Sequence, residues 1–168
     1  MALRRKPLQA LGRFAAVGGL LLGLLGVNVV ASAQASAAVI PQYLISNSAN
    51  ENFCMHASSG GGAGAWVTLE YCNANETGQW WYFLDGKVRN YQGNCLDSYN
   101  GQNPGTVIVW PCNGAASQNW VFSDHDGFRQ GGYKIEPPGQ TARPGNQLIM
   151  WPNNGTYWQS WYRSARVG

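Results

Sequence analysis

Two side chains lie at mirrored distances from two cysteines near the middle of the chain. Asp97 follows Cys95 by two residues, and Trp110 precedes Cys112 by two. A bridge between those cysteines would bring the carboxylate and the indole together. A short carboxylate accepts hydrogen bonds from two hydroxyl groups, and a flat aromatic ring covers an apolar face. The pair therefore suits a neutral ligand that has an edge of hydroxyls and a face of C–H bonds.

The chain contains four cysteines, for which three pairings are formally possible. Cys54 and Cys72 are 18 residues apart, Cys95 and Cys112 are 17 apart, and the two pairs fall at matching positions of an internal repeat. We therefore predict the disulfides Cys54–Cys72 and Cys95–Cys112, in an oxidising compartment. No Cys-x-x-Cys pair and no nearby His cluster accompanies them, so we expect no metal site and no cofactor.

The repeat itself is marked by three Gln-x-Trp triplets at spacings of 39 and 41 residues, which end at Trp81, Trp120 and Trp161. A period of this length indicates structural units that cannot each bury an apolar face alone. We place the three repeats at about 41–83, 84–123 and 124–164. A large aromatic residue that recurs once per repeat is typical of a core, so we expect the three tryptophans to be buried.

The elements that must position these side chains are short strands. Apolar or alternating runs are separated by Asn-Gly, Asp-Gly and Gly-Gly turn signals; these runs are 66–69, 107–110, 120–122 and 147–151. No segment after the first 37 residues shows a convincing helical period. Three repeats of about 40 residues, with about four short strands each, predict an all-β fold that closes with threefold pseudosymmetry, because closure removes exposed strand edges.

The first 37 residues are predicted to be a secretory signal peptide, followed by a single domain over 38–168. Four basic residues precede or begin an apolar stretch over 14–30, and small residues follow it at 31–37. A retained membrane anchor is the alternative, but 17 apolar residues are at the short limit for crossing a bilayer. The adjacent arginines Arg4 and Arg5 also fit a twin-arginine export signal. We expect a secreted protein without stable membrane insertion after cleavage.

Removal of the signal changes the charge balance. Of the 11 Lys and Arg residues, four lie in the signal, whereas all eight Asp and Glu residues follow it. The remaining seven bases and eight acids give residues 38–168 a net charge of −1. This balance provides little attraction for phosphate groups, so we expect no nucleic-acid partner. We expect the domain to act as a monomer.

The triplets, the segment Cys95-Leu96-Asp97 and the segment Trp110-Pro111-Cys112 resemble the ricin B-type lectin family, over about residues 41–164. The resemblance implies a β-trefoil that binds glycans or polysaccharides, with galactose- or xylose-type sugars as first candidates. In the family the acid, the aromatic and the Asn-Gln before the triplet Trp form the pocket. By this resemblance the main carbohydrate-binding site consists of Asp97, Trp110, Ser117 and Gln118, in which Ser117 replaces the usual Asn.

Repeat three offers a second candidate site. When Ile135-Glu136 is laid on Leu96-Asp97, Trp151 and Gln159 take the aromatic and glutamine positions. Glu136 is one methylene longer than Asp, and two prolines follow it directly. Either this site binds sugar, or Trp151 only packs under the loop.

Repeat one is not expected to bind. His56 stands at the position of the acid, and Glu70 stands at the position of the aromatic. An imidazole could act as a pH-sensitive ligand, but a lone His more often has a structural role.

Two other function classes were weighed against carbohydrate binding. A glycoside hydrolase needs two carboxylates across a cleft, but the eight acids are scattered over the repeats without a paired motif. Only His56 and His125 are available as histidine bases for a nucleophile, and neither lies in a nucleophile motif. We therefore expect no enzyme. The remaining alternative is a β-trefoil inhibitor or protein-interaction module, which would act on a secreted hydrolase through a loop such as 137–144.

Overall fold

The fold consists of short β-strands and single turns of 3-10 helix. The computed structural model describes residues 38–99 and 105–168, and the predicted signal peptide lies outside these residues. The strands are β1 Gln42–Asn47, β2 Asn50–Ala57, β3 Val67–Tyr71, β4 Trp81–Leu84, β5 Lys87–Asn90, β6 Cys95–Asp97, β7 Gly105–Thr106, β8 Ile108–Trp110, β9 Val121–Ser123, β10 Gly127–Gln130, β11 Tyr133–Glu136, β12 Asn146–Gln147, β13 Ile149–Pro152 and β14 Trp161–Val167. The 3-10 turns are η1 Ser59–Gly61, η2 Thr77–Gln79, η4 Ala116–Gln118, η5 Pro138–Gln140 and η6 Tyr157–Gln159.

A ring of three backbone hydrogen bonds joins the repeats. Val67 N–H donates to Val107 O (2.9 Å), Val107 N–H donates to Leu148 O (3.1 Å), and Leu148 N–H donates to Val67 O (2.8 Å). All three residues are fully buried. Their spacings of 40 and 41 residues repeat the period of the Gln-x-Trp triplets. The ring makes each repeat a neighbour of both others, and the predicted threefold β-trefoil is confirmed.

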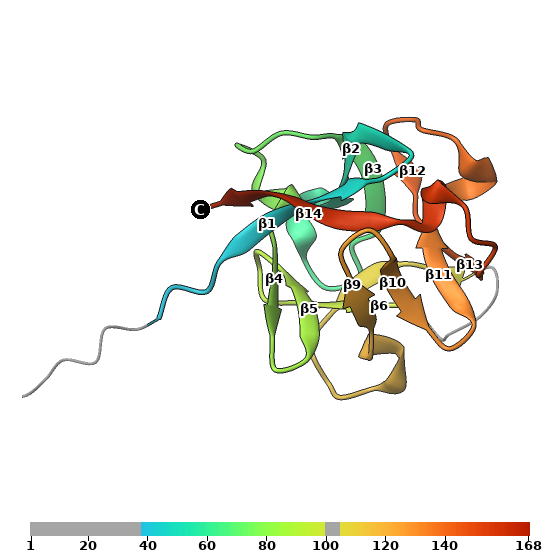
Figure 1. Ribbon diagram of the computed structural model, residues 1–168. Coiled ribbons are helices and arrows are strands. Elements are labelled where there is room, and N and C mark those ends of the chain that lie inside the picture. The colour runs from blue at the N-terminus through green and yellow to red at the C-terminus, as the bar shows by residue number, and fades with distance from the viewer. Residues whose placement is uncertain (1–37, 100–104) are drawn as a thin grey trace, which may run out of the picture. The chain divides into compact units, whose positions relative to one another are not determined.

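The strands pair within and between repeats. The hairpins β2–β3, β6–β8 and β11–β13 are antiparallel and share one register, with Cys54 opposite Glu70, Cys95 opposite Trp110, and Lys134 opposite Trp151. β1 pairs with β14, so the first and last strands of the domain lie side by side (Figure 1). β3 also pairs with β12, and β13 with β7. Closure by these pairings leaves few free strand edges.

The triplet tryptophans are buried in one apolar cluster with aliphatic and aromatic residues from all three repeats. Each indole N–H donates to a strand carbonyl: Trp81 to Met55 (3.0 Å), Trp120 to Leu96 (2.9 Å) and Trp161 to Ile135 (2.9 Å). A buried indole needs such an acceptor, since an unpaired N–H in the core is costly. Each triplet Trp therefore fixes a helical turn to the strand that precedes it in the same repeat.

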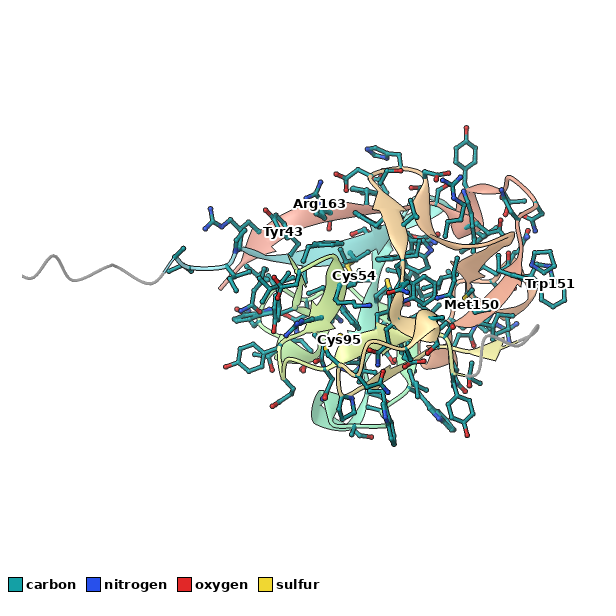
Figure 2. All side chains as sticks on the ribbon, turned by 90° about the horizontal axis from the view of Figure 1, so that it is seen from below. Tyr43, Cys54, Cys95, Met150, Trp151 and Arg163 are labelled. Carbon is teal, nitrogen blue, oxygen red and sulfur yellow. A yellow bond between two sulfur atoms is a disulfide. The ribbon has the colours of Figure 1, made fainter. Side chains whose placement is uncertain are left out.

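Both predicted disulfides are present. Cys54–Cys72 and Cys95–Cys112 have Cα–Cα distances of 4.9 and 5.1 Å (Figure 2). Each closes a loop of under 20 residues, and a cross-link of that length stabilises a fold by roughly 3 kcal/mol in the chain-entropy model. Each also ties the segment after the second strand of its hairpin to the first strand.

The apolar run 147–151 differs from its prediction as one strand. The structure divides it into β12 and β13, because Leu148 between them contributes its backbone to the threefold ring. β12 pairs with β3 of repeat one, while β13 pairs with β11 of its own repeat. Along β13 the side chains alternate: Met150 points into the core and Trp151 points outward (Figure 2).

Candidate functional site

The hairpin β6–β8 positions the acid and the aromatic of repeat two. Asp97 lies opposite Ile108 on the paired strands, and Trp110 lies two residues further along β8. Side chains at these positions share one face of the hairpin. They border a hollow of about 270 Å³. Its lining residues are Asp97, Tyr99, Ile108, Trp110, Asn113, Ala115 and Ser117.

The Asp97 carboxylate is held in a fixed orientation at the base of this hollow. It is only 5% exposed. Tyr99 N–H donates to Oδ1 (2.9 Å), and Gln118 Nε2 donates to Oδ2 (3.0 Å). A carboxylate offers about four lone-pair sites, so each oxygen keeps acceptor capacity for a ligand hydroxyl. Trp110 provides the complementary group, since its indole is 44% exposed on the same face.

Gln118 lies behind the carboxylate rather than in the wall of the hollow. It is fully buried. Its Oε1 accepts from Asn113 N–H (3.0 Å), and its Nε2 donates to Pro111 O (3.1 Å) as well as to Asp97. These bonds engage both ends of the amide, so Gln118 orients Asp97 and has no group to offer a ligand. Ser117, by contrast, lines the hollow as the resemblance implied.

Sequence reasoning did not include the other four residues of the hollow. Tyr99 stands two residues after the acid, with a positive φ of 30°, and is 54% exposed. Asn113 begins an Asn-Gly pair that recurs in repeat three, and its Oδ1 caps the turn by accepting from Ala115 N–H (2.9 Å). That recurrence was the available signal for Asn113. Ile108 was visible only as part of an apolar strand.

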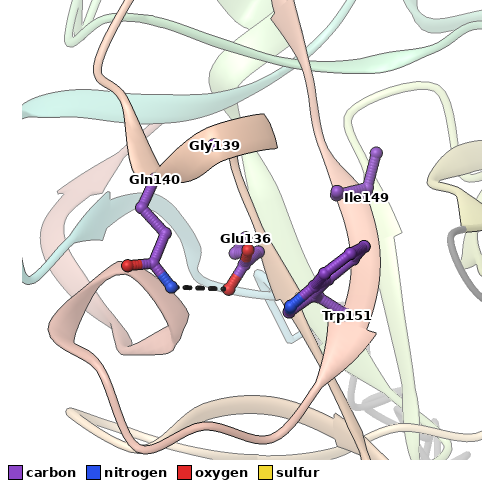
Figure 3. A pocket seen from close by; sticks show the side chains of 5 residues that line it. All are labelled: Glu136, Gly139, Gln140, Ile149 and Trp151. Carbon is purple, nitrogen blue, oxygen red and sulfur yellow. Dashed lines mark hydrogen bonds between the residues drawn. The ribbon is translucent and has the colours of Figure 1, made fainter.

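Repeat three places its candidate residues in a second hollow of about 350 Å³ (Figure 3). The register of β11–β13 repeats that of β6–β8, with Glu136 opposite Ile149 and Trp151 two residues further. The lining residues are Glu136, Gly139, Gln140, Ile149 and Trp151. Trp151 is 39% exposed. An acid and an aromatic therefore share a hollow in this repeat as well.

The carboxylate of repeat three is the more crowded of the two. Gln159 Nε2 donates to Glu136 Oε2 (2.8 Å), and Gln140 Nε2 donates to the same oxygen (3.4 Å). Gln140 comes from η5, so the loop predicted as a possible inhibitory element contributes to this hollow. Glu136 is 3% exposed, and this burial raises its pKa above the ordinary value. Gln159 is fully buried and also bonds Pro152 O, as Gln118 bonds Pro111 O.

Repeat one presents different groups at the same register. His56 lies opposite Thr68, and its Nδ1 is 3.3 Å from the Thr68 hydroxyl. Its Nε2 is 4.0 Å from a Glu76 carboxylate oxygen. A Cβ on Gly78 would lie 2.5 Å from Nε2, so the imidazole fills the space beside that turn. Gln79 keeps its two backbone bonds, to Asn73 N–H and Tyr71 O, although no carboxylate stands before it.

Metal and membrane features were also searched over residues 38–99 and 105–168. No group of three or more His, Cys, Asp or Glu side chains in this part of the chain is arranged to hold a metal ion. Among the same residues, no helix is long and apolar enough to cross a membrane.

Comparison with known proteins gives a family match and several structural likenesses. Residues 41–161 match the family model for the ricin-type beta-trefoil lectin domain. No curated protein matches the sequence. Three solved structures are similar to the chain. One is a mosquitocidal holotoxin (TM-score 0.64, 16% identity, 76% of this chain and 18% of that chain). The second is the C-half of an earthworm R-type lectin in complex with GalNAc (TM-score 0.60, 13% identity, 72% and 95%). The third is the agglutinin from Abrus precatorius (TM-score 0.61, 26% identity, 77% and 48%). The chain thus spans less than a fifth of the holotoxin and about half of the agglutinin chain.

Proposed function

Because the chain belongs to the ricin-type β-trefoil lectin domain family, we propose that it is a secreted lectin whose main carbohydrate site is the repeat-two hollow. The observation that carries this proposal is the shared face of Asp97 and Trp110. The carboxylate accepts from two vicinal hydroxyls of a pyranose, while the indole covers the C–H face of the same ring. Gln118 holds the carboxylate in place, so little orientation entropy is lost when the sugar binds.

The ligands we propose are galactose- or xylose-type sugars and the polysaccharides that contain them. The structurally similar earthworm lectin was solved with GalNAc, which supports a hexose-sized pocket in this fold. The repeat-three hollow, with Glu136, Trp151 and the buried Gln159, is proposed as a second site. Two shallow sites on one domain, or many on one polysaccharide, strengthen binding through effective concentration.

Binding rather than hydrolysis is the activity that the two hollows support. Each is lined by a single carboxylate, Asp97 or Glu136. Glycoside hydrolysis ordinarily requires two carboxyl groups on opposite sides of one scissile bond. The two disulfides agree with an oxidising, extracellular location, and we propose that residues 1–37 direct the export.

A binding screen followed by calorimetry tests this function. Residues 38–168 are first screened on a glycan array and on insoluble polysaccharides, and the best sugar is then titrated. Asp97→Asn and Trp110→Ala should each weaken repeat-two binding about tenfold or more, since each removes a charged hydrogen-bond acceptor or an aromatic face. Glu70→Ala, at the position of Trp110 in repeat one, is the matched control and should leave affinity unchanged. Unaltered affinity in both repeat-two variants would refute the assignment of the site.

A further inference from the structure

Trp66 is a large exposed side chain that neither the core nor the two hollows use. It precedes β3 in repeat one, and 57% of it is exposed. Its backbone forms an isolated antiparallel bridge with Ile108, whose side chain lines the repeat-two hollow. The flanking bonds run from Val67 N–H to Val107 O and from Val109 N–H to Ala65 O. Trp66 and Ile108 are thus a directly opposed pair without mutual hydrogen bonds, the arrangement in which side chains on one face come closest.

The indole of Trp110 lies against the same segment of repeat one. A Cβ built on Gly64 would be 3.4 Å from Cζ3 of Trp110. Gly64 has a φ of +83°, which favours glycine, and its missing side chain leaves the space that the ring borders. Trp66 follows two residues later and faces the side of the hairpin that carries the hollow. Diagonal neighbours of this kind are about 7–8 Å apart, so the two indoles border the hollow together.

The threefold symmetry shows that the fold does not require an indole at this position. The residues that precede the three members of the backbone ring are Trp66, Thr106 and Gln147. Thr106 lies opposite Ile149 in the repeat-three hollow, and Gln147 lies opposite Thr68 in repeat one. Two of three equivalent positions therefore hold polar side chains in the same backbone setting. The exposed indole is specific to the border of the repeat-two hollow.

We propose that Trp66 forms a second subsite, which binds the next sugar unit of a linear glycan whose first unit occupies the repeat-two hollow. Asp97 and Trp110 hold one pyranose, and the Trp66 indole packs against the C–H face of its neighbour along the chain. This subsite rests on the proposed carbohydrate binding by repeat two. It makes that site selective for oligosaccharides over monosaccharides. The repeat-three hollow, which has Thr106 at the equivalent position, lacks this selectivity.

The test compares chain lengths of one sugar in a protein whose repeat-three site is disabled by Trp151→Ala. Calorimetry measures affinity for galactose and galactotriose, and for xylose and xylotriose. Trp66→Thr copies the residue that the fold already holds at position 106, so the variant is expected to fold, and thermal unfolding checks this. Trp66→Phe keeps an aromatic face. Tyr157→Thr is the matched control, because Tyr157 is 76% exposed and lies in repeat three.

The expected result is a loss confined to the longer ligand. Trp66→Thr should weaken trisaccharide binding about 3- to 10-fold, the range that aromatic packing contributes, and leave monosaccharide binding unchanged. Trp66→Phe should retain most of the trisaccharide affinity, and Tyr157→Thr should change neither affinity. Equal trisaccharide affinity in the parent and Trp66→Thr, with monosaccharide binding intact, would overturn the subsite and leave the lectin assignment standing. Absence of all sugar binding in the parent would overturn both.

Discussion

Replacing Gln118 by Leu should destabilise the protein and disable the repeat-two site at once. Leu has a similar volume but removes two bonds to backbone groups, of Asn113 and Pro111, and one to the buried Asp97 carboxylate. A neutral hydrogen bond contributes about 1 kcal/mol, and one to a charged group about 1.5–3 kcal/mol. Water can enter from the open side of the hollow and offset part of this loss. We expect a decrease in the free energy of unfolding of about 3–4 kcal/mol, or roughly 8–15 °C in Tm.

Gln79 in repeat one provides a matched control for this substitution. Its side chain makes the same two backbone bonds, to Asn73 N–H and Tyr71 O, but has no carboxylate to orient. Gln79→Leu should therefore cost only about 2 kcal/mol of unfolding free energy and should leave sugar affinity unchanged. The difference between the two variants isolates the bond to Asp97.

Chemical unfolding and calorimetric titration of both variants measure the two effects. Gln118→Leu should weaken repeat-two binding about tenfold, because Asp97 loses the partner that fixes its rotamer. If the two variants lost the same stability, and Gln118→Leu bound sugar as the native protein does, then Gln118 would not orient Asp97 and our account of the site would be wrong.

Three further predictions concern pH and the disulfide of the site. Burial raises the pKa of Glu136 above its usual 4.5, so acidification should remove its carboxylate acceptor early. Sugar titrations in a variant without the repeat-two site should show affinity falling at a higher pH than an ordinary Glu would allow. The hydrogen bond from Arg163 holds the pKa of Asp124 below its usual 3.8. This pair therefore stabilises the fold fully above the unfolded pKa, and the stabilisation is lost as pH falls through the lower folded pKa. Denaturation curves between about pH 5 and pH 3 should show a smaller loss of stability for Asp124→Asn than for the native protein, by at most about 1 kcal/mol for so exposed a pair. Replacing both Cys95 and Cys112 by Ala should cost about 3 kcal/mol of unfolding free energy and weaken repeat-two binding more than repeat-three binding, as titration of each isolated site would show; equal weakening would contradict the local role of the bridge.

Several features of the fold follow from sequence period and residue type. The spacing of the triplets predicted three repeats, and the structure has them, because one buried Trp per repeat needs one strand carbonyl for its indole N–H. The matching positions of the cysteines predicted both bridges, since repeated hairpins place repeated residues at the same separation. The pairing of Asp97 with Trp110 was predicted for the same reason, as both lie close to one bridge.

Other features depend on which segments meet across repeats. Leu148 has no pattern of its own, yet its backbone closes the threefold ring and divides an apolar run into two strands. The glutamine of the triplet was predicted to lie in the pocket, but only side-chain packing places it behind the carboxylate.

The sequence alone determined the fold class, the repeat, the disulfides and the two acid–aromatic pairs, because these are encoded within each repeat by type and spacing. Only the tertiary structure decided that Trp66 of repeat one borders the hollow of repeat two. That contact depends on the register between strands that are about 40 residues apart along the chain. Such register is set by the closure of all three repeats around the ring of Val67, Val107 and Leu148, and no local pattern in the sequence records it.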